Sequence, residues 1–179
     1  DYSSANYWGA FVCRGGRRGD LPNFKVPGAD ADDLKEPPMA GAISSLKEMQ
    51  WAFTDVGKAG HGYSVWSGDV DLDKWYHVAV VDDPEQGSVV MYINGVPMLR
   101  NEYGTPGVAH GINGFDDRAW IIGGSMYNNQ MGTGFFGTIG EMRLIDYPTG
   151  PSQWLTARAP KASSPDPTRE SSTAPGTGR

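Results

Sequence analysis

The chain has 179 residues, 39% of them hydrophobic and 11% aromatic, which is sufficient for one domain with a substantial core. Its net charge of −6 argues against a nucleic-acid partner, because a nucleic-acid binder carries a basic patch. No apolar run approaches the ~20 residues of a membrane-spanning helix, so we expect no membrane span. The 25 glycines and 13 prolines are typical of many short strands joined by turns, which indicates an all-β protein.

The N-terminal part begins with a strand and continues into a long loop. Residues 10–13 have the apolar character of a buried strand, in which Cys13, the single cysteine, acts as a small hydrophobic side chain and can form no internal disulfide. Residues 20–46 contain four prolines, and proline cannot donate a hydrogen bond within a sheet. We therefore predict a long loop over 20–46, of a length that is usually functional or mobile.

The remainder of the chain alternates between strand-like runs and turns. Residues 75–81 and 88–93 are rich in β-branched and aromatic residues, which favours two strands. Asn94-Gly95 is the pair best suited to a type I′ turn, with positive φ at both positions, and predicts a hairpin tip. Further strands are predicted over 49–54, 62–67, 96–99, 120–124 and 135–145, and a single helical turn over 151–156. The tryptophans assigned to the core are Trp51, Trp75 and Trp120.

Three segments carry a family resemblance. Residues 75–81 (WYHVAVV), 91–95 (MYING) and 136–144 (FGTIGEMRL), in this order and spacing, resemble the LamG-like jelly-roll domain of the concanavalin A-like lectin/glucanase superfamily. The resemblance covers residues 7–154 and implies an antiparallel two-sheet β-sandwich, a jelly roll. In that pattern a strand precedes Tyr7, and we expect this fold to lack its first strand.

A narrower resemblance concerns the context of the domain. Residues 6–17 and 120–124 resemble the version that is appended to secreted bacterial metallophosphoesterases, which implies a secreted, extracellular or cell-envelope protein. We predict a domain over 1–158 and a linker or disordered tail over 159–179. The tail is rich in Pro, Ser and Thr and contains no aromatic residue, so it cannot bury enough apolar surface to offset its ordering entropy.

Loop aromatics and amides are the candidate ligand-binding residues. An aromatic ring can stack on the C–H face of a sugar, and amides supply hydrogen bonds to its hydroxyls. Residues 126–132 combine both with glycine in one predicted loop, and other candidates lie in separate segments. The predicted ligand-binding residues are Tyr127, Asn128, Asn129, Gln130, Trp66, Tyr103 and His110.

Calcium is the candidate cofactor, because domains similar to this one often bind it at loop rims. The ion needs six to eight oxygen ligands, mostly carboxylates and carbonyls. Two acidic pairs in predicted loops are the candidate metal ligands: Asp69 and Asp71, and Asp82 and Asp83.

The catalytic alternative depends on Asp69, Asp71 and Asp73. On a strand these carboxylates would share one side, as in the glucanases of the superfamily, and a retaining glycosidase needs its carboxyl pair about 5–5.5 Å apart. The three residues precede the predicted strand, which favours a solvated turn. We therefore predict a noncatalytic module that binds a glycan or another cell-surface ligand through rim loops. The alternative is a structural or assembly module that contacts a neighbouring protein domain.

Overall fold

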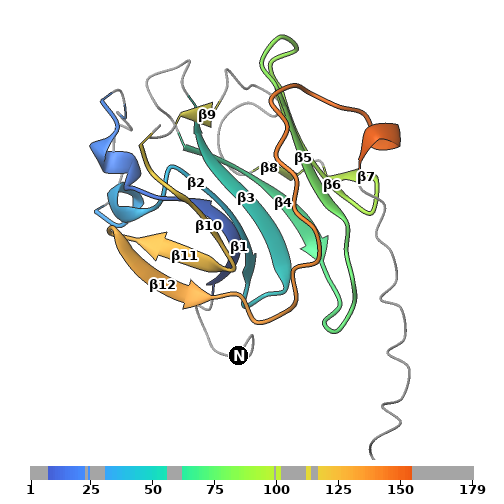
Figure 1. Cartoon of the computed structure of the whole chain (residues 1–179), viewed down its shortest axis with the longest axis horizontal. Coiled ribbons are helices and arrows are strands. Elements are labelled where there is room, and N and C mark those ends of the chain that lie inside the picture. The colour runs from blue at the N-terminus through green and yellow to red at the C-terminus, as the bar shows by residue number, and fades with distance from the viewer. Residues whose placement is uncertain are drawn as a thin grey trace, which may run out of the picture.

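The computed structural model describes residues 8–22, 24, 31–55, 62–98, 100–101, 112–113 and 117–154. Its regular structure consists of antiparallel strands and three short 3-10 turns, η1 (Arg18–Asp20), η2 (Asp33–Lys35) and η3 (Pro151–Gln153) (Figure 1). This confirms the all-β prediction, and η3 lies within the segment predicted to form a single helical turn. Within the described ranges, no helix is long and apolar enough to cross a membrane.

One layer of the fold is a seven-stranded antiparallel sheet in the order β10-β1-β2-β3-β4-β8, with β9 paired to β3. Its strands are β1 (Trp8–Arg14), β2 (Met39–Ser44), β3 (Glu48–Asp55), β4 (Gly62–Asp69), β8 (Arg100–Asn101), β9 (Ile112–Asn113) and β10 (Trp120–Ile122). The predicted strands over 10–13, 49–54 and 62–67 therefore lie in one sheet, with β2 between the first two.

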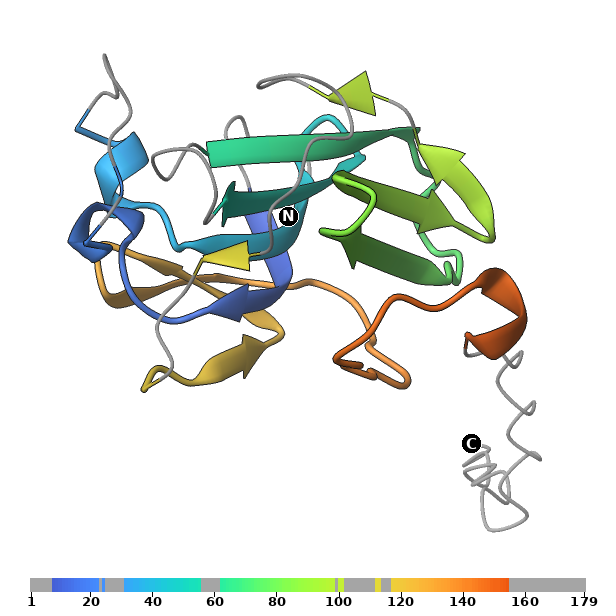
Figure 2. The ribbon, with the colours of Figure 1, turned by 90° about the horizontal axis from the view of Figure 1, so that it is seen from above.

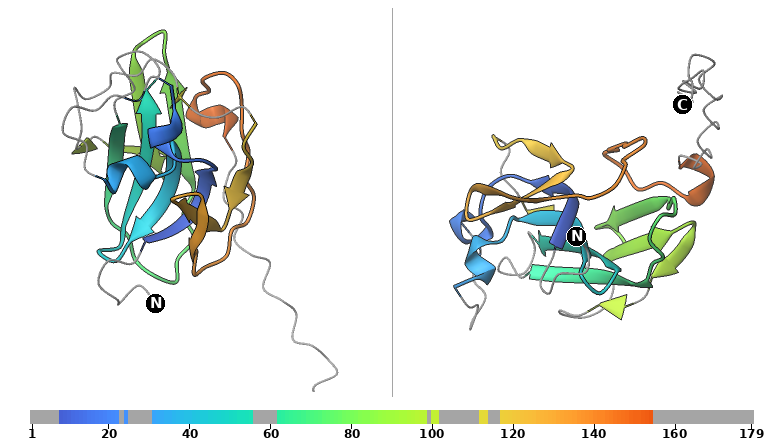
Figure 3. Two further views of the ribbon diagram at one scale, coloured as in Figure 1. Left: turned by 90° about the vertical axis from the view of Figure 1, so that its left-hand side faces the viewer. Right: turned by 90° about the horizontal axis from the view of Figure 1, so that it is seen from below.

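The second layer contains two smaller sheets. An extended segment, residues 135–147, follows the last strand of one sheet and runs toward the other. One sheet is the hairpin of β11 (Gly124–Tyr127) and β12 (Gln130–Gly134), and the other is β5 (Val78–Asp83), β6 (Ser88–Ile93) and β7 (Val96–Met98). All three parts lie on the same side of the seven-stranded sheet (Figures 1 and 2). The arrangement is a two-layer antiparallel sandwich, as the views in Figure 3 also show.

Aromatic residues fill the space between the layers. Gly41 of β2 pairs with Trp51, and a Cβ atom at Gly41 would lie only 2.4 Å from the Phe11 ring and 3.1 Å from the Trp51 ring. Phe11 in turn makes an edge-to-face contact with Phe135, at a centroid distance of 6.3 Å. Glycine is required at position 41 because both rings occupy the place of its side chain.

The core follows from the period-two pattern of β6. Val89, Met91 and Ile93 are buried, whereas the intervening side chains are only partly covered. Val89 packs with Phe53, and Met91 and Ile93 pack with Val65. Each such side chain contributes about 1.5–3 kcal/mol of burial free energy, so β6 is a principal link between the layers.

The predicted Asn94-Gly95 turn is confirmed. Asn94 has a φ of 51° and Gly95 a φ of 81°, and the turn joins β6 to β7 with Ile93 opposite Val96. The Asn94 side-chain oxygen also accepts a hydrogen bond from the His77 N–H at 2.8 Å, and the Asn94 N–H donates to the His77 carbonyl at 2.7 Å. These two hydrogen bonds fix His77, the residue directly before β5, to the turn.

The predicted burial of Cys13 is confirmed as well. The side chain has no exposed surface, and its Sγ donates a weak hydrogen bond to the Gly124 carbonyl at 3.5 Å. Burial raises the pKa of the Cys13 thiol. A buried thiol with a raised pKa is a structural residue rather than a nucleophile.

The prediction of an uninterrupted loop over 20–46 is wrong, because β2 occupies Met39–Ser44. The prolines end at Pro38, and the six residues that follow are apolar or small and nearly all buried. The strand therefore begins immediately after the last residue that could have broken it. The prediction failed because the four prolines were taken to exclude a strand from the whole range, although none of them lies within residues 39–44.

The prediction of a strand over 135–145 is also wrong. Phe135 N–H donates to the Gly123 carbonyl at 3.0 Å, but residues 135–145 form no ladder with the other described strands. Gly137 and Gly140 lie within this segment, and glycine weakens a strand because it adds backbone entropy and no packing. The segment is extended without being part of a sheet.

Two of the three core assignments for tryptophan are wrong. Trp75 is 48% exposed and Trp120 is 39% exposed, whereas Trp51 is partly buried against both core clusters. Trp75 lies in the connection before β5, which begins only at Val78, so the aromatic run that starts at residue 75 is longer than the strand. The Arg14 guanidinium lies over the Trp120 ring, 5.2 Å from its centroid.

Candidate functional site

The segment predicted to bind ligand is the tight turn between β11 and β12. Asn128 and Asn129 have φ values of 50° and 61°, and Tyr127 pairs with Gln130 across the turn. Two consecutive positive φ angles define a type I′ turn, and asparagine is among the few non-glycine residues that adopt this conformation readily. Four of the predicted ligand-binding residues therefore lie together at one hairpin tip.

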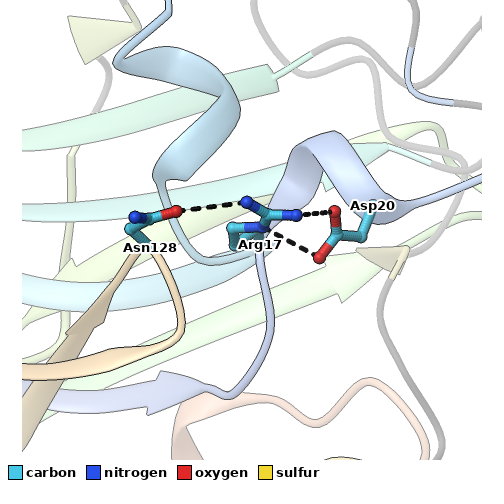
Figure 4. A network of polar contacts seen from close by, with 3 residues as sticks. All are labelled: Arg17, Asp20 and Asn128. Carbon is cyan, nitrogen blue, oxygen red and sulfur yellow. Dashed lines mark hydrogen bonds and ion pairs between the residues drawn. The ribbon is translucent and has the colours of Figure 1, made fainter.

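A guanidinium holds this turn against the segment that follows β1. Arg17 Nη1 donates to Asn128 Oδ1 at 3.2 Å, and the same guanidinium binds both carboxylate oxygens of Asp20, with Arg17 Nε 2.9 Å from Asp20 Oδ2 (Figure 4). The Asn128 N–H donates to the Lys35 carbonyl at 2.8 Å. The turn is thereby fixed to both η1 and η2.

Tyr127 is oriented by residues around η2. Its hydroxyl donates to Asp32 Oδ1 at 2.8 Å, and Lys35 Nζ lies 2.8 Å from the same oxygen. The ammonium group of Lys35 is 5.8 Å from the centroid of the Tyr127 ring, within cation–π range. Tyr127 is 39% exposed, so part of its ring is open to solvent although its hydroxyl is held.

The charges of this cluster compensate one another. We call Arg17, Asp20, Asp32, Lys35, Tyr127 and Asn128 the turn network. The hydrogen bond from Arg17 lowers the pKa of Asp20, and the hydrogen bonds from Lys35 and Tyr127 lower the pKa of Asp32. The bond to Asp32 raises the pKa of Tyr127, which remains a neutral donor near pH 7. The two cations, Arg17 and Lys35, and the two anions, Asp20 and Asp32, leave the turn network without net charge. Such a site suits a neutral ligand better than an anion.

Comparison with known protein families identifies the fold family. A family model described as the concanavalin A-like lectin/glucanases superfamily matches residues 39–153, more than half of the chain. The chain belongs to the concanavalin A-like lectin/glucanase superfamily. This confirms the family resemblance, and together with the antiparallel layers it confirms the predicted sandwich class. Neither the comparison with curated proteins nor the comparison with solved structures gives a match.

The other predicted ligand-binding residues of this lectin/glucanase-superfamily domain do not join the turn. Trp66 lies on β4, is only 7% exposed and makes an edge-to-face contact with Trp8 at 5.7 Å. The prediction that Trp66 is an exposed platform is therefore wrong, because its ring is buried within the strand predicted over 62–67. Tyr103 and His110 lie outside the described residues.

The acidic triplet does not have the geometry that the glycosidase hypothesis requires. Asp69 is the last residue of β4, Asp71 forms an ion pair with Lys74, and Asp73 has a φ of 58° in a turn. Because the strand ends at Asp69, the period-two rule does not apply, and Asp71 and Asp73 lie in an exposed connection with a turn, as the sequence favoured. The backbone N–H of Asp71 donates to the Tyr76 hydroxyl at 2.8 Å, which stabilises the turn.

The candidate calcium ligands fall into two separate places. Asp69 ends β4 and Asp71 follows it. Asp82 and Asp83 end β5, which runs from the β4–β5 connection to the opposite end of the sandwich (Figure 1). Asp83 Oδ1 accepts a hydrogen bond from the Gln86 N–H at 3.0 Å. Among the described residues no three His, Cys, Asp or Glu side chains are grouped so that they could hold a metal ion. Calcium binding stays a prediction.

Sequence reasoning missed the residues that organise the turn. Arg17 and Asp20, and likewise Asp32 and Lys35, are three positions apart, a spacing that brings their side chains together in a helical turn. This signal identifies each ion pair. It does not reveal that both pairs meet the turn, because Arg17 and Asn128 are 111 positions apart in the sequence.

Proposed function

We propose that the domain is a noncatalytic, extracellular recognition module that binds a neutral glycan at the β11–β12 turn. The observation that carries the proposal is the fixed Tyr127 ring, partly open to solvent and next to the amides of Asn128, Asn129 and Gln130. A ring face and several amides at one hairpin tip match the apolar face and the hydroxyls of a sugar. Secretion or display on a cell envelope fits this family of domains.

Preorganisation supports binding at this turn. A tight type I′ turn has little conformational freedom to lose, and the Tyr127 hydroxyl and the Asn128 backbone are already held by Asp32 and Lys35. Association otherwise costs about 0.5–1.5 kcal/mol for each side chain that becomes immobilised. A ligand would therefore meet a surface that is close to its bound arrangement.

The state of the carboxylates argues for recognition rather than hydrolysis. A glycosidase needs one carboxyl with a raised pKa to act as general acid. Asp20 and Asp32 are instead held ionised by Arg17 and Lys35, which lower the pKa of each. Neither carboxyl of the turn network is suited to donate a proton at neutral pH.

Glycan-array binding, with and without a chelator, tests the proposal. Tyr127→Ala should abolish binding, whereas Tyr127→Phe should retain part of it because the ring remains and only the bond to Asp32 is lost. Tyr147→Ala is the matched control, since that tyrosine is 62% exposed in the segment 135–147. Retained binding by Tyr127→Ala, or the absence of binding to any glycan, would contradict the proposal. Loss of binding with the chelator would support the calcium prediction.

An assembly role is the second candidate, and one specific observation favours it. The segment 135–147 exposes large apolar side chains, with Phe136 and Tyr147 each 62% exposed and Leu144 72% exposed. Exposed apolar surface of this kind is typical of a contact with protein. A neighbouring domain of a larger extracellular protein, such as a phosphoesterase, would be the partner.

Sedimentation velocity of the domain mixed with its neighbouring domain separates the two candidates. Complex formation that Phe136→Ser and Leu144→Ser abolish, without any glycan binding, would establish the assembly role. Glycan binding that depends on Tyr127 and is unaffected by these substitutions would favour recognition.

A further inference from the structure

A groove of about 330 Å³ lies on the outer face of β5 and β6, away from the core. The register pairs Val81 with Val90 and Asp83 with Ser88, so their side chains share the face opposite to the buried Val89 and Met91. Residues 148–150 form the other wall of the groove. The volume is at the lower end of the range for small-molecule sites, about 300–1,000 Å³.

Trp154 holds residues 148–150, the second wall of the groove, in place. Trp154 makes an edge-to-face contact with Tyr92 at 4.7 Å and stacks on His77 at 5.9 Å. Its indole N–H donates to the Thr149 carbonyl at 3.0 Å and lies 3.1 Å from Thr149 Oγ1. The segment before and through η3 is thereby tied to the β5–β6 hairpin, beside which it runs in orange and red in Figure 1. The groove is held open by contacts of the protein itself.

The chemistry of the lining indicates the class of ligand. Val81, Val90 and the Tyr92 ring supply apolar surface, and Asp83, Gln86 and Thr149 supply polar groups. None of the described residues that line the groove is basic, so a phosphate, sulfate or carboxylate would meet only the negative charge of Asp83. A carboxylate accepts hydrogen bonds from hydroxyl groups, and Asp83 retains acceptor capacity beyond its bond with the Gln86 N–H.

We propose that the groove between β5–β6 and residues 148–150 binds a neutral saccharide of one or two rings, as a second site separate from the turn network. The lining is mainly polar: Asp83 accepts hydrogen bonds from the hydroxyls of the sugar, and the smaller apolar part, from Val81 and Val90, contacts its C–H groups. The two sites share no residue, so binding in the groove does not depend on the function proposed for the turn.

An NMR titration of the ¹⁵N-labelled chain with maltose, cellobiose and lactose tests the groove. We expect at least one disaccharide to shift the amide signals of Val81, Val90 and Gly150, and Tyr127→Ala should leave these shifts unchanged. Asp83→Asn preserves the turn acceptor but removes the charge, and should weaken binding about five- to tenfold. Asp117→Asn is the matched control, because Asp117 is an exposed carboxylate outside the groove, and should have no effect.

Trp154→Ala provides a second variant, which removes the ring contact with Tyr92 and the hydrogen bond that holds Thr149. It should abolish the shifts while the amide signals of the buried residues of β6 stay dispersed. The proposal is overturned if none of the three sugars shifts the groove signals, if only signals of the β11–β12 turn move, or if Asp83→Asn and Trp154→Ala bind as the unmodified chain does.

Discussion

Trp66 and Trp75 provide a direct test of which aromatic residues stabilise the domain through burial. Trp66 is 7% exposed and contacts Trp8, so Trp66→Ala removes a nearly complete burial and leaves a cavity. Such a change costs about 3–5 kcal/mol. Trp75 is 48% exposed, so roughly half of its side chain already lies in water and Trp75→Ala should cost about 1–2 kcal/mol.

Urea unfolding followed by far-ultraviolet circular dichroism measures both losses. Trp66→Ala should lower the transition midpoint more than Trp75→Ala does, with an unchanged slope of free energy against urea concentration. Trp120→Ala, at 39% exposed, is a further reference for a partly exposed ring and should resemble Trp75→Ala. If Trp75→Ala proves as destabilising as Trp66→Ala, Trp75 belongs to the core and its half-exposed position is refuted.

Two further substitutions test the turns. Gly95 has a φ of 81° and open space where a Cβ would lie. Gly95→Val should therefore lower the free energy of unfolding by about 1 kcal/mol or more through backbone strain alone, and Gly95→Asn should lower it less. Thermal unfolding of both variants measures the difference. Arg17 and Lys35 lower the pKa values of Asp20 and Asp32 below their usual 3.8. These carboxylates therefore stabilise the folded state above that pH and lose the effect as the pH falls through their folded-state values. The double variant Asp20→Asn and Asp32→Asn should flatten acid unfolding in this window; an unchanged acid transition would refute the assignment.

Local sequence signals predicted the elements that local chemistry decides. Asn94-Gly95 specified its turn because positive φ at two consecutive positions allows few residue types. The β-branched and aromatic content of residues 88–93 likewise indicated the strand β6. The family motifs added the sandwich class, since their order along the chain matches that of the lectin/glucanase superfamily.

Features that depend on distant parts of the chain could not be predicted in this way. Whether Trp66 or Trp75 is buried depends on which distant segment packs against each ring, and each tryptophan has another aromatic residue close to it in the sequence. The hydrogen bond of Tyr127 to Asp32 joins residues 95 positions apart.

The interrupted second layer has a consequence for how the domain opens. β1 to β4 share continuous backbone ladders, whereas β5–β6–β7 and β11–β12 are separate hydrogen-bonded sheets, linked by an extended segment that adds no ladder of its own. Cooperative unfolding units tend to follow such supersecondary motifs. Amide protons of β5–β7 therefore exchange with solvent as one group and those of β11–β12 as another, while the amides of β2 and β3 exchange last. The β11–β12 turn belongs to a unit that can detach while the large sheet stays folded.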